Sequence, residues 1–380
     1  MLGPYRADLV GGSKVITYIG NRVFSPCSDI ASLELTSDDL TKVVTRLGAD
    51  ESLRHLHTID ALIFREAVSY FHAVGADWCS LPVTTRMISS PGEVYRGERL
   101  NYTTDSVPIT LEWFDQSRKI FLSESSQFYL ELRLLIPSVN RVFSIYNSFR
   151  KEQGDFSHLA EFQHIEFEGK VSFEENIAIA LGLVLHLVRG VLEKCEESLR
   201  FFLDDPSIEA LQTFSALSFK RLTFQEAMEI LAEDTQLPEY REPSLKHFGA
   251  WEEIRLGQII GKSLIITHYP LEEIPFYHNE APVNGKIRVA ENADIVLSGY
   301  REVIGSGSRI SDTAKLAEKA RFFNLPVADY DPYLMSRAQA SFRQTAGFGL
   351  GWQRFTHWLL RLPAIWRASH IPRTHLNPIP

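Results

Sequence analysis

Two groups of strand-like segments, separated by a long apolar helix, constrain the fold of this chain more than any other feature of its sequence. The first group shows alternating or continuous apolar character at 107–114, 119–122, 141–146 and 161–168. Ser172 and Glu175 then have the capping-box spacing that starts a helix, and apolar residues continue to about Leu203. The second group lies at 264–268, 287–289 and 294–297, and Asn284-Gly285 forms a turn within it. We therefore predict an α+β domain built on one antiparallel sheet flanked by helices.

Helical periodicity places the remaining elements around that sheet. Apolar residues recur at helical spacing over 52–74, and Gly75 ends this long amphipathic helix. A second capping box, Thr223 with Glu226, starts a shorter helix, and further helices are predicted over 311–323, 331–343 and 352–362. Residues 1–50 predict a small N-terminal appendage of a few strands. The main domain then covers 51–380, with a helical insertion at about 172–262.

Composition excludes several functional classes. The 380 residues are 44% apolar and 23% charged, as in a globular protein, and the formal net charge of −9 provides no overall basic field for nucleic acid. The three cysteines are far apart and lack a CxxC pair, which argues against a disulfide framework or a zinc site. No apolar run approaches the roughly 20 residues that span a bilayer, and His186 interrupts the richest one, which predicts a buried helix. We expect a cytoplasmic protein that does not enter a membrane.

The first dense polar segment follows the strand at 141–146. Arg150, Glu152, His158 and Phe162 lie on or beside a predicted hairpin whose return strand is 161–168. A guanidinium suits a phosphate, a carboxylate suits an exocyclic amine, and an aromatic face suits a purine, so this set fits a nucleotide. A solvated hairpin with surface ion pairs explains the same residues about as well.

Two further segments have the character of anion sites. In the first, alternating glycines from Gly347 to Gly351 run into a helix with Arg354 in its first turn, which suits an anion at the helix start. The spacing is not the GxGxxG of a dinucleotide fold, and glycines that only let a helix cross a sheet remain the alternative. In the second, Glu302 precedes the glycines and serines that lead to Arg309. Beside phosphate-binding arginines it makes sense only with a bridging Mg²⁺, whereas alone it is an ordinary strand residue.

Together these segments resemble the catalytic domain of class II aminoacyl-tRNA synthetases, in the subgroup of asparaginyl, aspartyl and lysyl enzymes, and most closely the asparaginyl branch. The family pattern FRxE, then HLAEF, then a paired-Glu tail is met by Phe149-Arg150-Lys151-Glu152, 158–162, Glu166 and Glu168. The pattern GxGxGxER is met by 347–354, except that Gln353 replaces Glu. Residues 301–309, REVIGSGSR, resemble the family's GEIIGGSQR, and 122–127, LSESSQ, resemble its amino-acid-site loop. The resemblance covers about 52–380.

The resemblance implies a role for each matching position. It assigns ATP binding to a set of residues from the first two segments: Arg150, Glu152, His158, Phe162, Gly351 and Arg354. It assigns the amino-acid pocket to a second set: Gln127, Glu131, Gln163 and Arg309. Glu302 carries Mg²⁺ together with Glu168 or Asp294, and Arg150, Arg354 and Glu302 act in catalysis. The chemistry implied is attack of an amino-acid carboxylate on the α-phosphorus of ATP, which needs positioning and charge neutralisation rather than a protein nucleophile.

Departures from the family pattern shape the expected function. Only about 50 residues precede the core, which is short for the anticodon-reading barrel of the family, and Ser90 or Pro91 occupies the place of a Glu that binds the α-amino group. We expect a homodimeric, ATP- and Mg²⁺-dependent ligase that adenylates aspartate, asparagine or a close analogue and passes the acyl group to an amine. The dimer is implied by the helix before Pro82. The alternatives are a tRNA ligase that recognises only the acceptor stem, with tRNA possible but not favoured, and an inactive regulatory paralogue.

Overall fold

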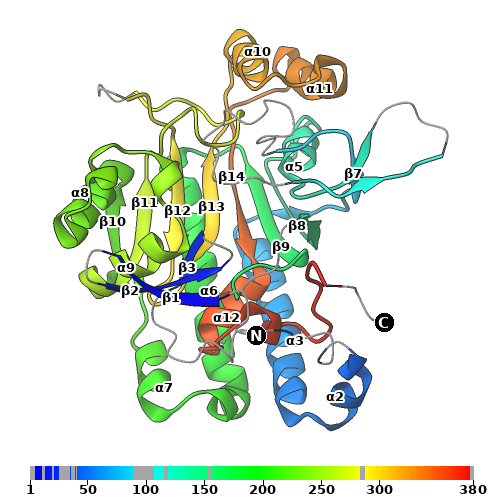
Figure 1. Ribbon diagram of the computed structural model, residues 1–380. Coiled ribbons are helices and arrows are strands. Elements are labelled where there is room, and N and C mark those ends of the chain that lie inside the picture. Colours follow the sequence, from blue (N-terminus) through cyan, green and yellow to red (C-terminus); the bar gives the residue numbers. More distant parts are fainter. Residues whose placement is uncertain are drawn as a thin grey trace.

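A computed structural model of the chain describes residues 5–10, 13–18, 21–24, 35, 39, 41–89, 107–114, 119–151, 156–282 and 287–376 (Figure 1). An eight-stranded sheet at its centre has the order β10-β11-β12-β13-β14-β9-β8-β4. Its strands are β4 (Asp77–Trp78), β8 (Arg141–Phe149), β9 (Glu161–Gly169), β10 (Phe219–Thr223), β11 (Ser263–Thr267), β12 (Asn292–Val296), β13 (Glu302–Ser308) and β14 (Ala346–Gly351). The two outermost pairs are parallel and the five inner pairs are antiparallel. The predicted α+β fold on one antiparallel sheet is therefore confirmed.

Two long helices cover one face of this sheet. Helix α3 (Glu51–Ala73) packs along α6 (Phe173–Phe202), and both bury apolar side chains against inner strands. Phe71 of α3, for example, stacks on Phe143 of β8 with ring centroids 4.5 Å apart. Ser172 caps α6 by accepting from the amide of Glu175, as its sequence spacing predicts.

By length and composition α6 is the one helix of the described residues that could cross a membrane. Its buried residues pack on α3 and the sheet, which is the behaviour of a core helix. The buried helix predicted around His186 is therefore confirmed.

The remaining elements surround the sheet (Figure 1). The other helices are α2 (Val43–Ala49), α5 (Gln127–Arg133), α7 (Asp205–Gln212), α8 (Phe224–Thr235), α9 (Ala250–Ile260), α10 (Thr313–Phe322), α11 (Val327–Leu334) and α12 (Trp352–Leu359). Short 3-10 helices span Ala216–Ser218, Pro238–Arg241, Leu245–His247, Met335–Ala338 and Ile365–Ala368. Two small sheets consist of β1 (Tyr5–Val10), β2 (Ser13–Tyr18) and β3 (Asn21–Phe24), and of β5 (Thr84–Thr85), β7 (Ile120–Leu122) and β6 (Thr110–Leu111). The strands expected near the N-terminus are thus present.

Three predicted elements differ from the structure. The segment 172–262 is not an insertion apart from the sheet, because α6 belongs to the central core and β10 forms a sheet edge. The helix predicted over 331–343 ends early: α11 stops at Leu334 and a 3-10 turn follows. The expected strand at 287–289 is reduced to an isolated bridge between Val289 and Pro270. The turn pair Asn284-Gly285 lies outside the described residues.

Strand alternation on β9 sorts its side chains between the two faces of the sheet. Ile165 and Phe167 are fully buried in the core with α3 and α6. Phe162, His164, Glu166 and Glu168 have the opposite parity, so they line the other face. This second face carries the candidate site.

Candidate active site

Two arginines from distant parts of the chain converge over β9. Arg150 follows β8 directly, and its amide donates to the carbonyl oxygen of Ala160 at 2.9 Å. Arg354 lies in the first turn of α12, three residues after Gly351, which pairs with His164 across the sheet. Burial, together with the positive charges of Arg150 and Arg354, holds the pKa of His164 well below its usual value. Both guanidiniums therefore lie within electrostatic range of the same imidazole.

An aromatic surface adjoins these arginines. The guanidinium carbon of Arg150 lies 5.4 Å from the centroid of the Phe162 ring, and this ring meets His164 edge-on at 4.9 Å. A cation on an aromatic face is an arrangement that also accepts a purine. Glu152, predicted to read the adenine, lies outside the described residues.

Three carboxylates cluster beside Arg354. The Glu302 amide donates to Oε2 of Glu253 at 2.9 Å, and Nη1 of Arg354 lies 3.6 Å from Oε2 of Glu302. Burial and the neighbouring Glu302 raise the pKa of Asp294 well above its usual value, and burial also raises the pKa of Glu253. Glu253, on α9, carries no motif that could have marked it in the sequence. Carboxylates that repel each other in this way fit a hard divalent cation.

A cation at this cluster would need further ligands. No group of three or more metal-ligating side chains with the geometry of a metal site occurs in the described part of the chain. Mg²⁺ commonly takes one or two carboxylates and completes its shell with phosphate oxygens and water. Glu302 and Asp294 therefore fit a metal that arrives with a nucleotide.

The structure does not bring Glu168 to this cluster. Register places Glu168 opposite Gly347 on β14, which in turn faces Gly307 on β13. Glu302 lies five residues before Gly307 on the same strand, a separation of roughly 16 Å at about 3.3 Å per residue. The prediction that Glu168 shares a cation with Glu302 is therefore wrong.

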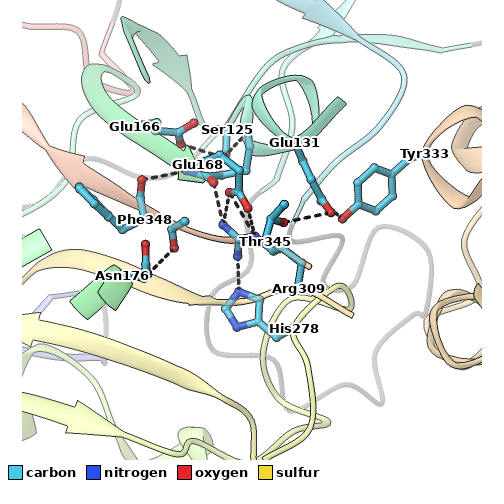
Figure 2. Close-up of polar contacts among 12 residues, drawn as sticks. Ser125, Glu131, Glu166, Glu168, Asn176, His278, Arg309, Tyr333, Thr345 and Phe348 are labelled. Atoms are coloured by element: carbon cyan, nitrogen blue, oxygen red, sulfur yellow. Dashed lines mark hydrogen bonds and ion pairs between the residues drawn. The ribbon is translucent and has the colours of Figure 1, made fainter. Parts of the chain in front are cut away.

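Glu168 instead forms a buried ion pair with Arg309 (Figure 2). Nη2 of Arg309 donates to Oε2 of Glu168 at 2.7 Å, and the guanidinium also donates to Oε1 of Gln127 at 2.7 Å. Its carbon lies 5.0 Å from the centroid of the Tyr277 ring. Burial alone lowers the pKa of Arg309, but the Glu168 carboxylate outweighs this and raises it. Arg309 and Gln127, both predicted for the amino-acid pocket, are therefore hydrogen-bonded to each other in the protein interior.

Glu131 lies next to the Arg309–Gln127 pair and has its own ion-pair and hydrogen-bond partners. Its carboxylate lies 2.7 Å from Nη2 of Arg337 and accepts from the hydroxyls of Tyr333 at 2.5 Å and Thr345 at 3.4 Å. Figure 2 shows Tyr333 pointing toward Glu131. Glu131 is among the charges that raise the pKa of Arg309, so it lies within electrostatic range of the pocket. Arg337, in a 3-10 turn, was not anticipated from the sequence.

Gln163 does not belong to the pocket. It has the same strand parity as Ile165 and Phe167, which face the helices. Its amide donates to Oε1 of Gln353 at 2.9 Å, and its side chain donates to Oδ1 of Asn147 at 3.2 Å. The prediction that Gln163 contacts the amino acid is therefore wrong, and Gln353 is its hydrogen-bond partner.

Two acidic side chains, Glu166 and Glu124, lie between the Arg150–Arg354 pair and Arg309. Oε1 of Glu166 accepts from Oγ of Ser125 at 2.9 Å, whereas its Oε2 has no hydrogen-bond partner among the described residues. Burial raises the pKa of Glu166 to about 7. Glu124, which the sequence did not single out, accepts from the amide and hydroxyl of Ser89. Ser90 and Pro91, at the place of the Glu that binds the α-amino group in the family pattern, lie outside the described residues.

His158 lies at the turn that leads into β9, and a further arginine contacts it. Nη1 of Arg301 is 2.8 Å from Nε2 of His158 and 2.9 Å from Oγ of Ser157. Nε of Arg301 lies 3.4 Å from Oε2 of Glu253. Burial and the positive charge of Arg301 both lower the pKa of Arg354. Arg301 therefore connects the hairpin, the acidic cluster and Arg354.

Comparison with known proteins agrees with this arrangement. Residues 101–375 match the family described as tRNA synthetases class II (D, K and N). The chain belongs to this family. It is 33% identical over 272 residues to the asparagine–tRNA ligase of Thermus thermophilus, an alignment that covers 70% of the chain and 60% of that relative. The corresponding ligase of Desulforamulus reducens is 32% identical over 259 residues, an alignment that covers 67% of this chain and 57% of that relative. The chain thus spans about 60% of the length of these relatives.

Solved structures show the same fold at lower identity. Asparaginyl-tRNA synthetase from Pyrococcus horikoshii, complexed with asparaginyl-adenylate, superposes with a TM-score of 0.77 at 23% identity, over 96% of this chain and 78% of that one. The Entamoeba histolytica asparaginyl enzyme, also complexed with asparaginyl-adenylate, gives 0.74 at 22% identity, over 96% and 77%. The resemblance drawn from the sequence motifs is therefore confirmed for family and fold.

Proposed function

We propose that this protein binds ATP with Mg²⁺ and activates asparagine, or a close relative, as an aminoacyl-adenylate. One observation carries the proposal: Arg150 and Arg354 converge on the face of the sheet that also holds the Arg309–Gln127 pocket. A triphosphate and a small amino acid bound at these two places would lie side by side.

The residues account for the reaction without a protein nucleophile. A carboxylate oxygen of the amino acid attacks the α-phosphorus, the bond from that phosphorus to the bridging oxygen of the β-phosphate breaks, and pyrophosphate leaves with the electron pair. Arg150 and Arg354 neutralise the charge that develops on the phosphoryl oxygens, and each such contact is worth about 3 kcal/mol in the transition state. Phe162 would stack on the adenine. Bound Mg²⁺, held by Glu302 and Asp294, would screen the outer phosphates.

Charge around the pocket favours a carboxamide over a carboxylate. Two buried arginines, Arg309 and Arg337, are each matched by a buried glutamate, Glu168 and Glu131. Glu166 adds further negative character when ionised. A second carboxylate on the substrate would therefore lack an unmatched cation, whereas an amide can donate to one of these acceptors. We accordingly place asparagine ahead of aspartate.

The acceptor of the acyl group separates two versions of the proposal. The relatives named above are asparagine–tRNA ligases, which favours the terminal hydroxyl of a tRNA as acceptor. Transfer to an amine such as ammonia, expected from the sequence, draws no support from the comparisons and is retained as the other outcome of the acceptor assay.

Isotope exchange tests the activation step. Purified protein with ATP, Mg²⁺ and labelled pyrophosphate should incorporate label into ATP when asparagine is added, and less with aspartate. Arg354→Ala should abolish the exchange, whereas Arg200→Ala, on the surface of α6, should leave it unchanged. Binding of ATP with no exchange for any amino acid would instead support a regulatory paralogue. Acid-precipitable charging of tRNA and release of amide product then distinguish the acceptors.

We also propose a homodimer through the edge of the sheet near Pro82. Pro82 lines a cavity of about 270 Å³, and Trp78 on the edge strand β4 is 63% exposed. A tryptophan exposed on an edge strand, with a cavity close by in the chain, is typical of a protein interface. Trp78→Asp should lower the mass measured by analytical ultracentrifugation, and Leu217→Asp, on a remote exposed turn, should not.

A further inference from the structure

Arg301 stands where the family pattern quoted above has glycine. The pattern GEIIGGSQR begins with Gly, and the matching segment of this chain begins Arg301-Glu302. Arg301 therefore places a guanidinium next to Glu302, which is proposed above to hold Mg²⁺. The side chain of Arg301 is 15% exposed, which leaves it within reach of a ligand.

The contacts of Arg301 direct its charge toward the outer end of the nucleotide site. Its Nη1 reaches Nε2 of His158 at 2.8 Å, and a guanidinium can only donate, so Nε2 of His158 acts as the acceptor. The imidazole thus offers no proton from this nitrogen to a phosphate. Arg301 therefore carries a fixed positive charge at this end of the site.

Arg301 and Arg354 both lie at the same acidic cluster. Glu253 lies 3.4 Å from Nε of Arg301, and Glu302, the next residue in the chain, lies 3.6 Å from Nη1 of Arg354. Guanidiniums held close together are stabilised when a polyanion lies between them. Arg150 lies within electrostatic range of His164, as Arg354 does.

We propose that Arg301 is an additional phosphate-binding residue. It binds the β- and γ-phosphates of ATP, and then the pyrophosphate that the reaction releases. This inference rests on the proposed function, because it presumes a nucleotide at the site. It differs from a purely structural role, in which Arg301 only ties the 157–158 turn to α9 through Ser157 and Glu253.

Binding measurements distinguish these two roles. Calorimetry would record the affinity of the folded protein for Mg²⁺–pyrophosphate and, separately, for AMP. We expect Arg301→Gln to weaken pyrophosphate binding by about tenfold to a hundredfold, the range for a charge-assisted contact, and to change AMP binding less than twofold. Ser157→Ala, which removes a neutral partner of Arg301, should have a much smaller effect on pyrophosphate. Arg200→Gln, which breaks a surface ion pair, is the charge-matched control.

Each outcome has a defined meaning. Equal losses for AMP and pyrophosphate in Arg301→Gln, or no loss for either, would overturn the inference. If the wild-type protein itself bound neither ligand, the proposed function would fail instead. Should Arg301→Gln not fold, Arg301→Lys decides, because it keeps the charge and loses the planar fork. Several-fold weaker pyrophosphate binding with unchanged AMP binding supports the role, and unchanged binding of both rejects it.

Discussion

Nη2 of Arg309 lies 2.7 Å from Oε2 of Glu168, and the two side chains are 2% and 0% exposed. The pair is held in place on both sides, since Gln127 accepts from the guanidinium and Gly347 leaves the space that the carboxylate occupies. A methyl group at Gly347 would overlap Oε2 of Glu168. Gly347, the first glycine of the GxGxG segment, therefore makes space for the Glu168 carboxylate, as well as for any approach of a ligand.

Removing one member of this pair should be costly. Glu168→Ala leaves a buried guanidinium without its counter-ion, and we expect a loss of about 3–5 kcal/mol in the free energy of unfolding. Glu168→Gln keeps one acceptor and should lose less. Urea denaturation measures both, and Glu196→Ala, from an exposed pair with Arg200, should cost less than about 1 kcal/mol. A Glu168→Ala protein as stable as the wild type would show that Arg309 is not held by Glu168.

Metal dependence should follow Glu302 rather than Glu168. Glu302→Gln and Asp294→Asn remove a ligand from the cluster beside Arg354, so the Mg²⁺ concentration that gives half-maximal pyrophosphate exchange should rise by at least about tenfold. Glu168→Gln should alter the dependence on amino acid and leave the dependence on Mg²⁺ unchanged. A shift in the Mg²⁺ curve for Glu168→Gln alone would contradict the separation of the two carboxylates along the sheet.

Local signals in the sequence were sufficient for most of the fold. The N-cap at Ser172 and the capping box at Thr223 mark helix starts because the bonds they form are between near neighbours in the chain. The helix predicted over 331–343 was misplaced, since the structure continues α11 through Pro332 and ends it at Leu334, where packing outweighs local preference. The parallel pairing of β10 with β11 depends on tertiary contacts that no local pattern records.

The sequence predicted the site residues that belong to motifs. It missed the residues that only burial in the folded protein brings to the site. Arg150, Arg354, Arg309 and Gln127 were identified by their positions in family-like motifs. In the structure Arg150 and Arg354 both act on His164, and Arg309 donates to Gln127. Gln163 was predicted for the amino-acid pocket from its motif position. Its strand parity, which it shares with the apolar Ile165 and Phe167, already argues against that placement. Two further charged residues, Glu253 beside Glu302 and Arg337 beside Glu131, come from α9 and a 3-10 turn, and only the folded chain brings them there.

Glu166 should make stability depend on pH in a defined direction. Burial raises its pKa from 4.5 to about 7, so between these values the folded state binds more protons than the unfolded state. Its contribution to the free energy of unfolding is therefore greatest below about pH 4.5, falls as the pH rises, and is lost above about pH 7. The change amounts to roughly 3 kcal/mol.

Glu166→Gln removes this titration. The difference in unfolding free energy between the variant and the wild type should grow in favour of the variant as the pH rises from 5 to 8, measured by urea denaturation at one protein concentration. A difference that stays constant over that range would show that Glu166 titrates near its ordinary value in the folded protein.

A chain of side-chain amides explains why Gln353 replaces the family's Glu. The backbone amide of Gln163 donates to Oε1 of Gln353, so Nε2 of Gln353 must face Oε1 of Gln163. Gln163 then donates to Asn147 at 3.2 Å, and Asn147 donates to Oε1 of Glu161 at 2.6 Å. Every donor in this series of hydrogen bonds points the same way, and the series ends on the Glu161 carboxylate, which can only accept.

Restoring Glu at 353 should therefore destabilise the protein unless the far end of the chain also changes. Gln353→Glu puts two acceptors against Gln163, and rotating each amide in turn only moves the conflict to Glu161, so we expect a loss of about 1–3 kcal/mol. Adding Glu161→Gln supplies a donor at that end and lets the whole chain reverse, which should recover most of the loss. Urea denaturation of the two single variants and the double variant gives the coupling energy. Additive losses, with no recovery in the double variant, would show that the amides are not connected in this order.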